Sequence, residues 1–271
     1  MTVSRGIFVA LAAALILAAD ITPAYAQGED NPLEFRTEFQ RIGLEVGLSS
    51  VWQSGRYLAG CGDFNEGAKI NGIFALAYDY PIIPEVLRFE ALLGYQGRSI
   101  KSTYNSRELV PIRTTDASVY PDVSVDFENV GEASFSYVFL LPSVKLYPTK
   151  AIYVGAGLSA NLLMNASTQY TKNIISKTVD IPDVGLSEVF YSEQESSDPY
   201  SKVFAEEDRS DASSFGLDAA IFVGAELPIG RRLKLGPRLM YTIAMNPVLE
   251  NPELKLNSLQ FLVGVRFDLQ D

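Results

Sequence analysis

Apolar and polar residues alternate along most of the chain from residue 42 onward. Eight stretches carry an apolar residue at nearly every second position, as Leu44, Val46 and Leu48 do in the first. A period of two puts successive side chains on opposite faces of a β-strand. The sequence therefore predicts eight two-faced strands, at about 42–52, 70–80, 87–95, 133–147, 152–162, 215–227, 233–245 and 261–269.

The fourth stretch is less regular than the others. Phe135, Tyr137, Phe139 and Leu141 share one parity, the other parity carries apolar residues as well, and Pro142 interrupts the run. Proline removes a ladder hydrogen bond and is found mainly at edges and bulges. We therefore expect a bulge or a change of side-chain parity near this proline.

The connections between the predicted strands are of two kinds. Those after the second, fourth and sixth strands are tight turns, at Pro81–Glu85, Pro148–Lys150 and Pro228–Arg231. Those after the first, third, fifth and seventh are longer, at about 53–69, 102–131, 166–211 and 247–257. Short turns on one side and long loops on the other are typical of outer-membrane barrels. The predicted fold is all-β, an eight-stranded antiparallel up-and-down transmembrane β-barrel.

Charged residues decide which face of the barrel meets lipid. Twelve of them share the polar parity of the strands: Glu45, Asp79, Arg88, Glu90, Arg98, Lys145, Asp218, Glu226, Lys234, Arg238, Arg266 and Asp268. Each lysine or arginine facing the bilayer midplane costs about 2–4 kcal/mol. The cost of exposing a dozen charges to lipid would be roughly tens of kcal/mol, which exceeds a typical total stability of about 5–15 kcal/mol. In a membrane they must therefore point inward, and we expect a salt-bridged plug in an interior that side chains just fill.

A soluble barrel with an apolar interior would instead leave these charges in water. The equal numbers of acids and bases in this set favour the membrane barrel, because enclosed charges need partners. Aromatic residues near the predicted strand ends suit interfacial belts. The expected belt residues are Trp52, Tyr78, Tyr80, Tyr147, Tyr153, Phe215 and Phe267.

The N-terminal region reads as an export signal. Arg5 precedes the apolar run from Gly6 to Ala19, and Ala24-Tyr25-Ala26 offers a small-x-small cleavage site. We expect residues 1–26 to be a cleaved signal peptide, 27–41 a short periplasmic tail, and 42–271 the barrel domain.

The amino-acid composition argues against several classes of function. The chain has 33 acidic and 22 basic residues, so nucleic acid is not an expected partner. It has no histidine, which is the commonest general base, and a single cysteine, Cys61. We therefore expect neither an enzyme nor a cofactor. The acidic segment 180–211 suggests a solvated outer loop, or weak calcium capture as a second hypothesis.

The hairpin formed by Phe139–Tyr147 and Tyr153–Leu158 resembles the central hairpin of the PorT-like outer-membrane β-barrel family. That family shares its barrel type with small OmpX- and OmpA-type proteins. The resemblance implies an eight-stranded barrel with both termini in the periplasm and no catalytic residues. The apolar parity of the last strand is similar to the assembly signal of such barrels, although Asp268-Leu269-Gln270-Asp271 follow it.

Together these patterns predict a non-enzymatic protein of the outer membrane of a Gram-negative bacterium, with a structural or surface-interaction role through its long loops. A narrow gated pore and a soluble periplasmic ligand-binding barrel are the alternatives. The expected partners are outer-membrane lipid, lipopolysaccharide, the barrel-assembly machinery and an extracellular or secretion-system protein.

Overall fold

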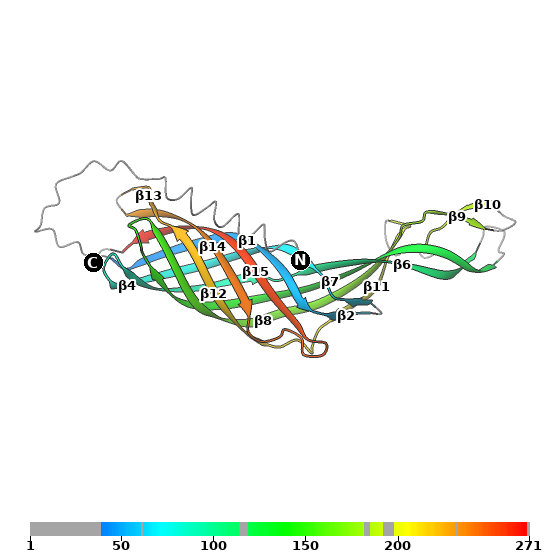
Figure 1. Ribbon diagram of the computed structural model, residues 1–271, viewed down its shortest axis with the longest axis horizontal. Coiled ribbons are helices and arrows are strands. Elements are labelled where there is room, and N and C mark those ends of the chain that lie inside the picture. Colours follow the sequence, from blue (N-terminus) through cyan, green and yellow to red (C-terminus); the bar gives the residue numbers. More distant parts are fainter. Residues whose placement is uncertain are drawn as a thin grey trace, which may run out of the picture. The chain divides into compact units, whose positions relative to one another are not determined.

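A computed structural model describes residues 39–60, 62–113, 119–181, 185–191, 198–230 and 232–269. The predicted signal peptide, residues 27–38 of the predicted tail and Cys61 lie outside these ranges. Figure 1 shows a ring of tilted strands, with further strands continuing beyond it. The strands are β1 (Arg41–Gly55), β2 (Tyr57–Ala59), β3 (Gly62–Phe64), β4 (Ala68–Ile83), β5 (Leu87–Gly97), β6 (Ile100–Arg113), β7 (Val119–Leu146), β8 (Ile152–Ile174), β9 (Thr178–Ile181), β10 (Gly185–Glu188), β11 (Ser201–Asp208), β12 (Phe215–Ala225), β13 (Leu227–Pro228), β14 (Leu233–Ala244) and β15 (Leu254–Asp268).

Eight antiparallel strands close the ring. Their order is β1, β4, β5, β7, β8, β12, β14 and β15, and β15 pairs with β1 from Arg41↔Asp268 to Gly55↔Leu254. Each strand is joined to the next one around the ring, which is the up-and-down topology predicted from the alternation. Closure leaves no unpaired strand edge in the ring, as a bilayer requires.

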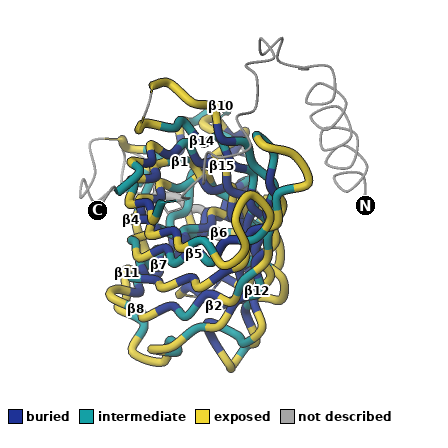
Figure 2. Tube along the Cα trace, turned by 90° about the vertical axis from the view of Figure 1, so that its left-hand side faces the viewer, coloured by how far each residue is buried: buried dark blue, intermediate teal, exposed yellow. Residues whose placement is uncertain are grey.

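The apolar parity faces outward and the charged parity faces inward. Leu44, Leu48 and Ile70 are 51, 60 and 66% exposed, whereas Glu45, Asp79 and Glu90 have no exposure. Figure 2 shows buried and exposed residues alternating along the strands of the ring. A band of large apolar side chains around a charged interior is stable only where hydrocarbon covers the band. The fold is therefore a transmembrane β-barrel, and the soluble alternative is wrong.

The prediction of a bulge or a parity change near Pro142 is wrong, because the irregularity lies on β8. β7 keeps its odd-numbered residues inside from Phe135 to Lys145, and its register with β8 is continuous across the proline. The extra residue is on β8, where Ser136 pairs with Asn165 and Tyr137 pairs with Leu163. Met164 thus forms a bulge, after which Ala166 is the inward residue.

Two of the aromatic residues predicted for the interfacial belts point inward instead. Tyr153 points into the lumen and is 1% exposed, and the Tyr147 hydroxyl donates to Glu226 Oε1 at 2.6 Å. Both share the inward parity of their strands. Tyr78, Tyr80, Phe215 and Phe267 are exposed on the outer face, as expected, and Trp52 stacks on Tyr241 at 5.8 Å.

The predicted long loops are largely β-structure. Residues 102–131 belong mostly to β6 and β7, and β8 continues from the ring to Ile174. Beyond the ring β6, β7, β8 and β11 pair in that order. This part has its own apolar core, which includes Val125, Phe127 and Ile181. We call β6, residues 119–133 of β7, residues 167–174 of β8 and β9 to β11 the outer module.

Candidate functional site

Six charged side chains meet at the centre of the barrel. This central cluster consists of Glu45, Asp79, Glu90, Lys145, Arg238 and Arg266, each 1% exposed or less. It contains three acids and three bases, so its formal charges cancel. Because charges taken out of water are costly unless they are paired, the balance is what allows the cluster to exist.

Arg266 and Arg238 connect the three carboxylates. Arg266 Nε lies 2.5 Å from Asp79 Oδ2, its Nη2 lies 2.5 Å from Glu45 Oε1, and it also pairs with Glu90. Arg238 Nη2 lies 2.7 Å from Glu90 Oε2, and its Nε donates to the Tyr153 hydroxyl at 3.1 Å.

Lys145 completes the cluster. Its Nζ lies 2.6 Å from Glu90 Oε1 and 3.1 Å from Asp79 Oδ1, and 4.7 Å from the centre of the Tyr153 ring. Cations are attracted to the faces of aromatic rings. Tyr153, which the sequence assigned to the lipid interface, therefore contacts cations inside the barrel.

Strand register brings these residues together. Asp79 and Glu90 are cross-strand partners on β4 and β5, and Glu45 faces Gly264 across β1 and β15. A Cβ atom on Gly264 would lie 2.8 Å from Glu45 Cγ. The glycine thus leaves the space that the carboxylate and the Arg266 guanidinium occupy.

A second layer of charges lies at the end of the barrel that carries the short turns. Arg41 Nη1 lies 2.7 Å from Glu226 Oε2, and Arg41 Nε lies 2.8 Å from Asp268 Oδ1. Lys234 Nζ is 3.8 Å from Glu226, and Arg88 Nη2 donates to the Phe39 carbonyl at 2.7 Å. A cavity of about 130 Å³ lies among these side chains and opens at this end.

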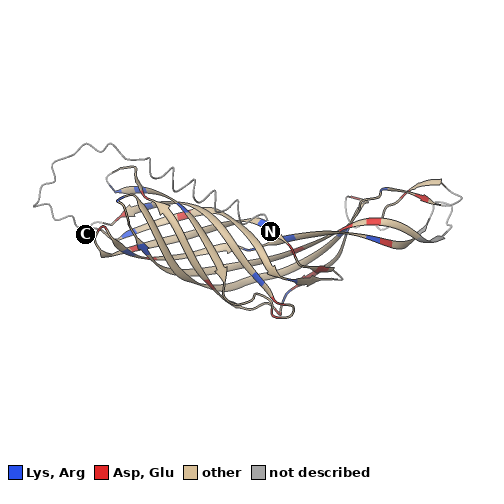
Figure 3. Cartoon of the chain, in the orientation of Figure 1, with Lys and Arg blue, Asp and Glu red and all other residues tan. Residues whose placement is uncertain are grey.

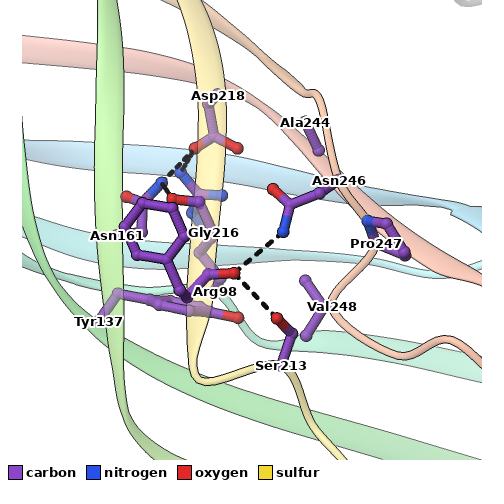
Figure 4. A pocket seen from close by; sticks show the side chains of 11 residues that line it. Arg98, Tyr137, Asn161, Ser213, Gly216, Asp218, Ala244, Asn246, Pro247 and Val248 are labelled. Carbon is purple, nitrogen blue, oxygen red and sulfur yellow. Dashed lines mark hydrogen bonds and ion pairs between the residues drawn. The ribbon is translucent and has the colours of Figure 1, made fainter.

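A third polar layer lies toward the other end, shown in Figure 4. Arg98 pairs with Asp218, and Asn161 Nδ2 donates to Asp218 Oδ2 at 2.9 Å. Gln96 lies beside them, and its side-chain oxygen accepts from Arg98 Nη2 at 2.9 Å. The cavity beside them measures about 10 Å³, which is about the space of a single water molecule.

Apolar side chains fill the lumen around the polar layers. One group around the central cluster includes Leu92, Phe139, Phe222 and Leu262. Leu92, Phe222 and Leu262 share the parity of the charged residues, and sequence reasoning did not predict this apolar layer inside the barrel.

The hairpin of β2 and β3 covers the outer end of the lumen. Tyr57 and Phe64 stack at 5.3 Å and are almost fully buried, and Phe64 lies 6.2 Å from the Tyr170 ring. A Cβ atom on Gly131 would lie 2.5 Å from the Phe64 ring, so this glycine makes room for the aromatic cap. The described lumen is therefore closed by two apolar groups and three polar layers.

All twelve residues predicted for the interior network lie on the lumen side of the ring. Ten are buried, and Lys234 and Asp268 are partly exposed, with 26 and 15% of their side-chain surface accessible. They lie in three layers, and Lys145 Nζ, 3.8 Å from Glu226 Oε1, links the central cluster to the layer at the short turns. Figure 3 shows the strands of the ring mostly in tan, with charged residues at few positions along them.

Sequence reasoning missed Arg41, which was assigned to the tail. In the structure β1 begins at Arg41 and its side chain is 6% exposed. Its position two residues before Gly43, in the inward parity, was a signal that could have placed it in the barrel.

The outer module carries ion pairs on its surface. Arg107 Nε lies 2.6 Å from Asp126 Oδ1, and Lys172 Nζ lies 2.5 Å from Glu108 Oε2. The hydrogen bond from Lys172 holds the pKa of Glu108 below its usual value. Burial raises the pKa of Tyr191, which packs against the module core, to about 12.

The described part of the acidic segment 180–211 does not gather into a metal site. No group of three or more acidic or cysteine side chains among the described residues could hold a metal ion. Asp183, Glu193 and Glu195 lie outside the described ranges. Among the residues that are described, no helix has the length and apolar character needed to cross a membrane.

No family model matches this sequence, and no curated protein matches it either. Among solved structures, Ail of Yersinia pestis is 8% identical, with 85% of this chain and 100% of that chain covered and a TM-score of 0.35. Neisserial surface protein A is 11% identical, with 84 and 97% covered and a TM-score of 0.34. The outer membrane protease OmpT of Escherichia coli is 10% identical, with 88 and 99% covered and a TM-score of 0.34. These scores are low, and the fold assignment rests on the strand pairing and exposure of this chain.

Proposed function

We propose that this protein is a non-enzymatic outer-membrane β-barrel that presents a rigid β-module to a partner outside the cell. The short turns, the start of β1 and the end of β15 then face the periplasm, and the outer module faces the exterior, as in bacterial barrels of this type. The predicted resemblance to the PorT-like family is compatible with this role, but a secretion function does not follow from it.

The observation that carries the proposal is the continuity of strands β7 and β8 from the ring into the outer module. β7 has 28 residues and β8 has 23, whereas a strand needs only about 9–11 to cross a bilayer. Their outer parts pair with β6 and β11 and have a separate apolar core. The module is thereby joined to the barrel wall by two continuous strands, which favours presentation of a defined surface.

The exposed surface of the module suits a protein partner. Leu109, Leu186, Phe190 and Phe204 are 66, 81, 55 and 51% exposed. Aromatic and large aliphatic anchors of this kind dominate protein–protein interfaces. Hydrocarbon does not account for them, because they lie beyond the lipid-facing ring.

A photo-crosslinking amino acid tests this role in intact outer membranes. Placed at Leu109 it is expected to form a covalent adduct with a protein outside the cell. Placed at Leu48, on the lipid face of β1, it is the matched control and should yield no such adduct. An absence of protein adducts at Leu109 and at Phe204 would contradict the surface role.

The narrow gated pore is the alternative, and planar-bilayer recordings separate the two. The closed polar and apolar layers lead us to expect no unitary conductance from the purified protein. Steady channel events would favour the pore and would require the central cluster to open.

A further inference from the structure

An open apolar groove crosses the outer face of β15, β1, β4 and β5 near the end that carries the short turns. Its volume is about 730 Å³, within the range of about 300–1,000 Å³ found for small-molecule sites. Leu44, Leu76, Leu93 and Val265 form its walls, and each is between 42 and 51% exposed.

The groove exists because the outward-facing residue in its middle is small. Ala91 points outward from β5, opposite Tyr78 on β4 and Pro142 on β7. The backbone of Gly43 and Ala77, cross-strand partners on β1 and β4 whose side-chain positions face the lumen, also lines the groove. Because the side chain of Ala91 is only a methyl group, it leaves a gap between the longer side chains around it.

The rim toward the short turns carries aromatic and polar groups. Phe267 and Tyr78 line this end, and the Tyr78 hydroxyl donates to Gln40 Oε1 at 3.0 Å. Amphipathic aromatic rings concentrate at the headgroup level of a bilayer.

We propose that this groove holds one acyl chain of a glycerophospholipid from the periplasmic leaflet, with its headgroup at the level of Tyr78 and Phe267. A hydrocarbon chain is the occupant because the groove lies within the apolar band that a bilayer covers. The choice of leaflet rests on the orientation given under the proposed function. The ring and its lipid face do not depend on that role.

Native mass spectrometry of the full-length protein tests the site. The protein is extracted in mild detergent and supplied with phosphatidylglycerol. Wild type is expected to retain one phospholipid, and Ala91→Trp, which fills the groove, is expected to lose it. Ala219→Trp is the matched control, since Ala219 points outward between Leu158 and Ile243 on the β8, β12 and β14 wall and should leave retention unchanged.

Gel migration of unheated samples shows which variants form a closed barrel. If Ala91→Trp does not fold, Ala91→Leu replaces it and should reduce retention. Equal retention by the groove variants and wild type, loss in Ala219→Trp, or no adduct in wild type would overturn the proposal. A retained lipid A mass would overturn it too, as would a dimer that Ala91→Trp converts to a monomer. Module crosslinking at Leu109 is independent of each of these outcomes.

Discussion

Replacing Arg266 by methionine tests the idea that the central cluster is held together by charge balance. Arg266→Met keeps much of the side-chain volume but leaves Glu45, Asp79 and Glu90 with only two cations. Removing one partner of a buried ion pair typically costs about 3–5 kcal/mol, because a charge stays buried without compensation. Such a loss is a large share of a typical stability of about 5–15 kcal/mol.

Guanidinium chloride unfolding in detergent micelles measures the loss, with the folded fraction read from gel migration of unheated samples. For an unfolding slope of about 4 kcal/mol per M, a loss of about 4 kcal/mol lowers the midpoint by about 1 M. Lys234→Met is the control, because that lysine is partly exposed and lies 3.8 Å from its nearest carboxylate partner. A weak, partly solvated pair of this kind contributes about 0–1 kcal/mol.

The double variant Arg266→Met/Glu90→Gln separates charge from packing. It leaves two acids and two bases in the cluster, so the midpoint should recover part of the loss. If Arg266→Met shifts the midpoint no more than Lys234→Met does, or if the second substitution adds to the loss, charge balance does not hold the cluster together.

Three further predictions concern the cap, the outer module and the bulge. Phe64→Ala should lower the free energy of unfolding by about 3–5 kcal/mol, since it empties the aromatic cap; Leu58→Ala, at a 47% exposed position, should change it little in the same titration. The pKa of Glu108 is lowered in the folded module, so its contribution to stability is present above its usual value of 4.5 and is lost as the pH falls through the folded pKa. Lowering the pH from 5 to 3, about the range in which a glutamate titrates, should therefore accelerate limited proteolysis of the module less in Glu108→Gln than in wild type. Identical proteolysis profiles of the two proteins would contradict the assignment. Deleting Met164 should leave a closed, heat-modifiable barrel because it removes only the bulge, whereas deleting Ala160 should abolish the closed form because it reverses the parity of one part of β8; equal behaviour of the two deletions would refute the register.

The sequence predicted the ring because its strands have a strict period of two. Charges cannot face hydrocarbon, so the parity of Glu45, Arg238 and Arg266 was enough to place them inside. The same reasoning failed at Tyr147 and Tyr153, because an aromatic residue is compatible with either face and only its parity could have decided.

The outer module was harder to recognise. Val123, Val125 and Phe127 alternate, which was a usable signal for a strand, but β6 carries a mixed polar sequence without an apolar face. A strand outside the membrane does not need a lipid-facing parity, so its pattern is weak. The segment was therefore expected to be a loop.

By itself the sequence determined the number of ring strands, their two faces and the balance of charges that the lumen must hold, because these follow from local alternation and the cost of exposing charge to lipid. Only the tertiary structure decided which acid meets which base, since residues such as Glu45 and Arg266 are brought together by strand register and ring closure. It also decided that the lumen is closed in layers and that the bulge lies at Met164, because both depend on contacts between strands far apart in the chain.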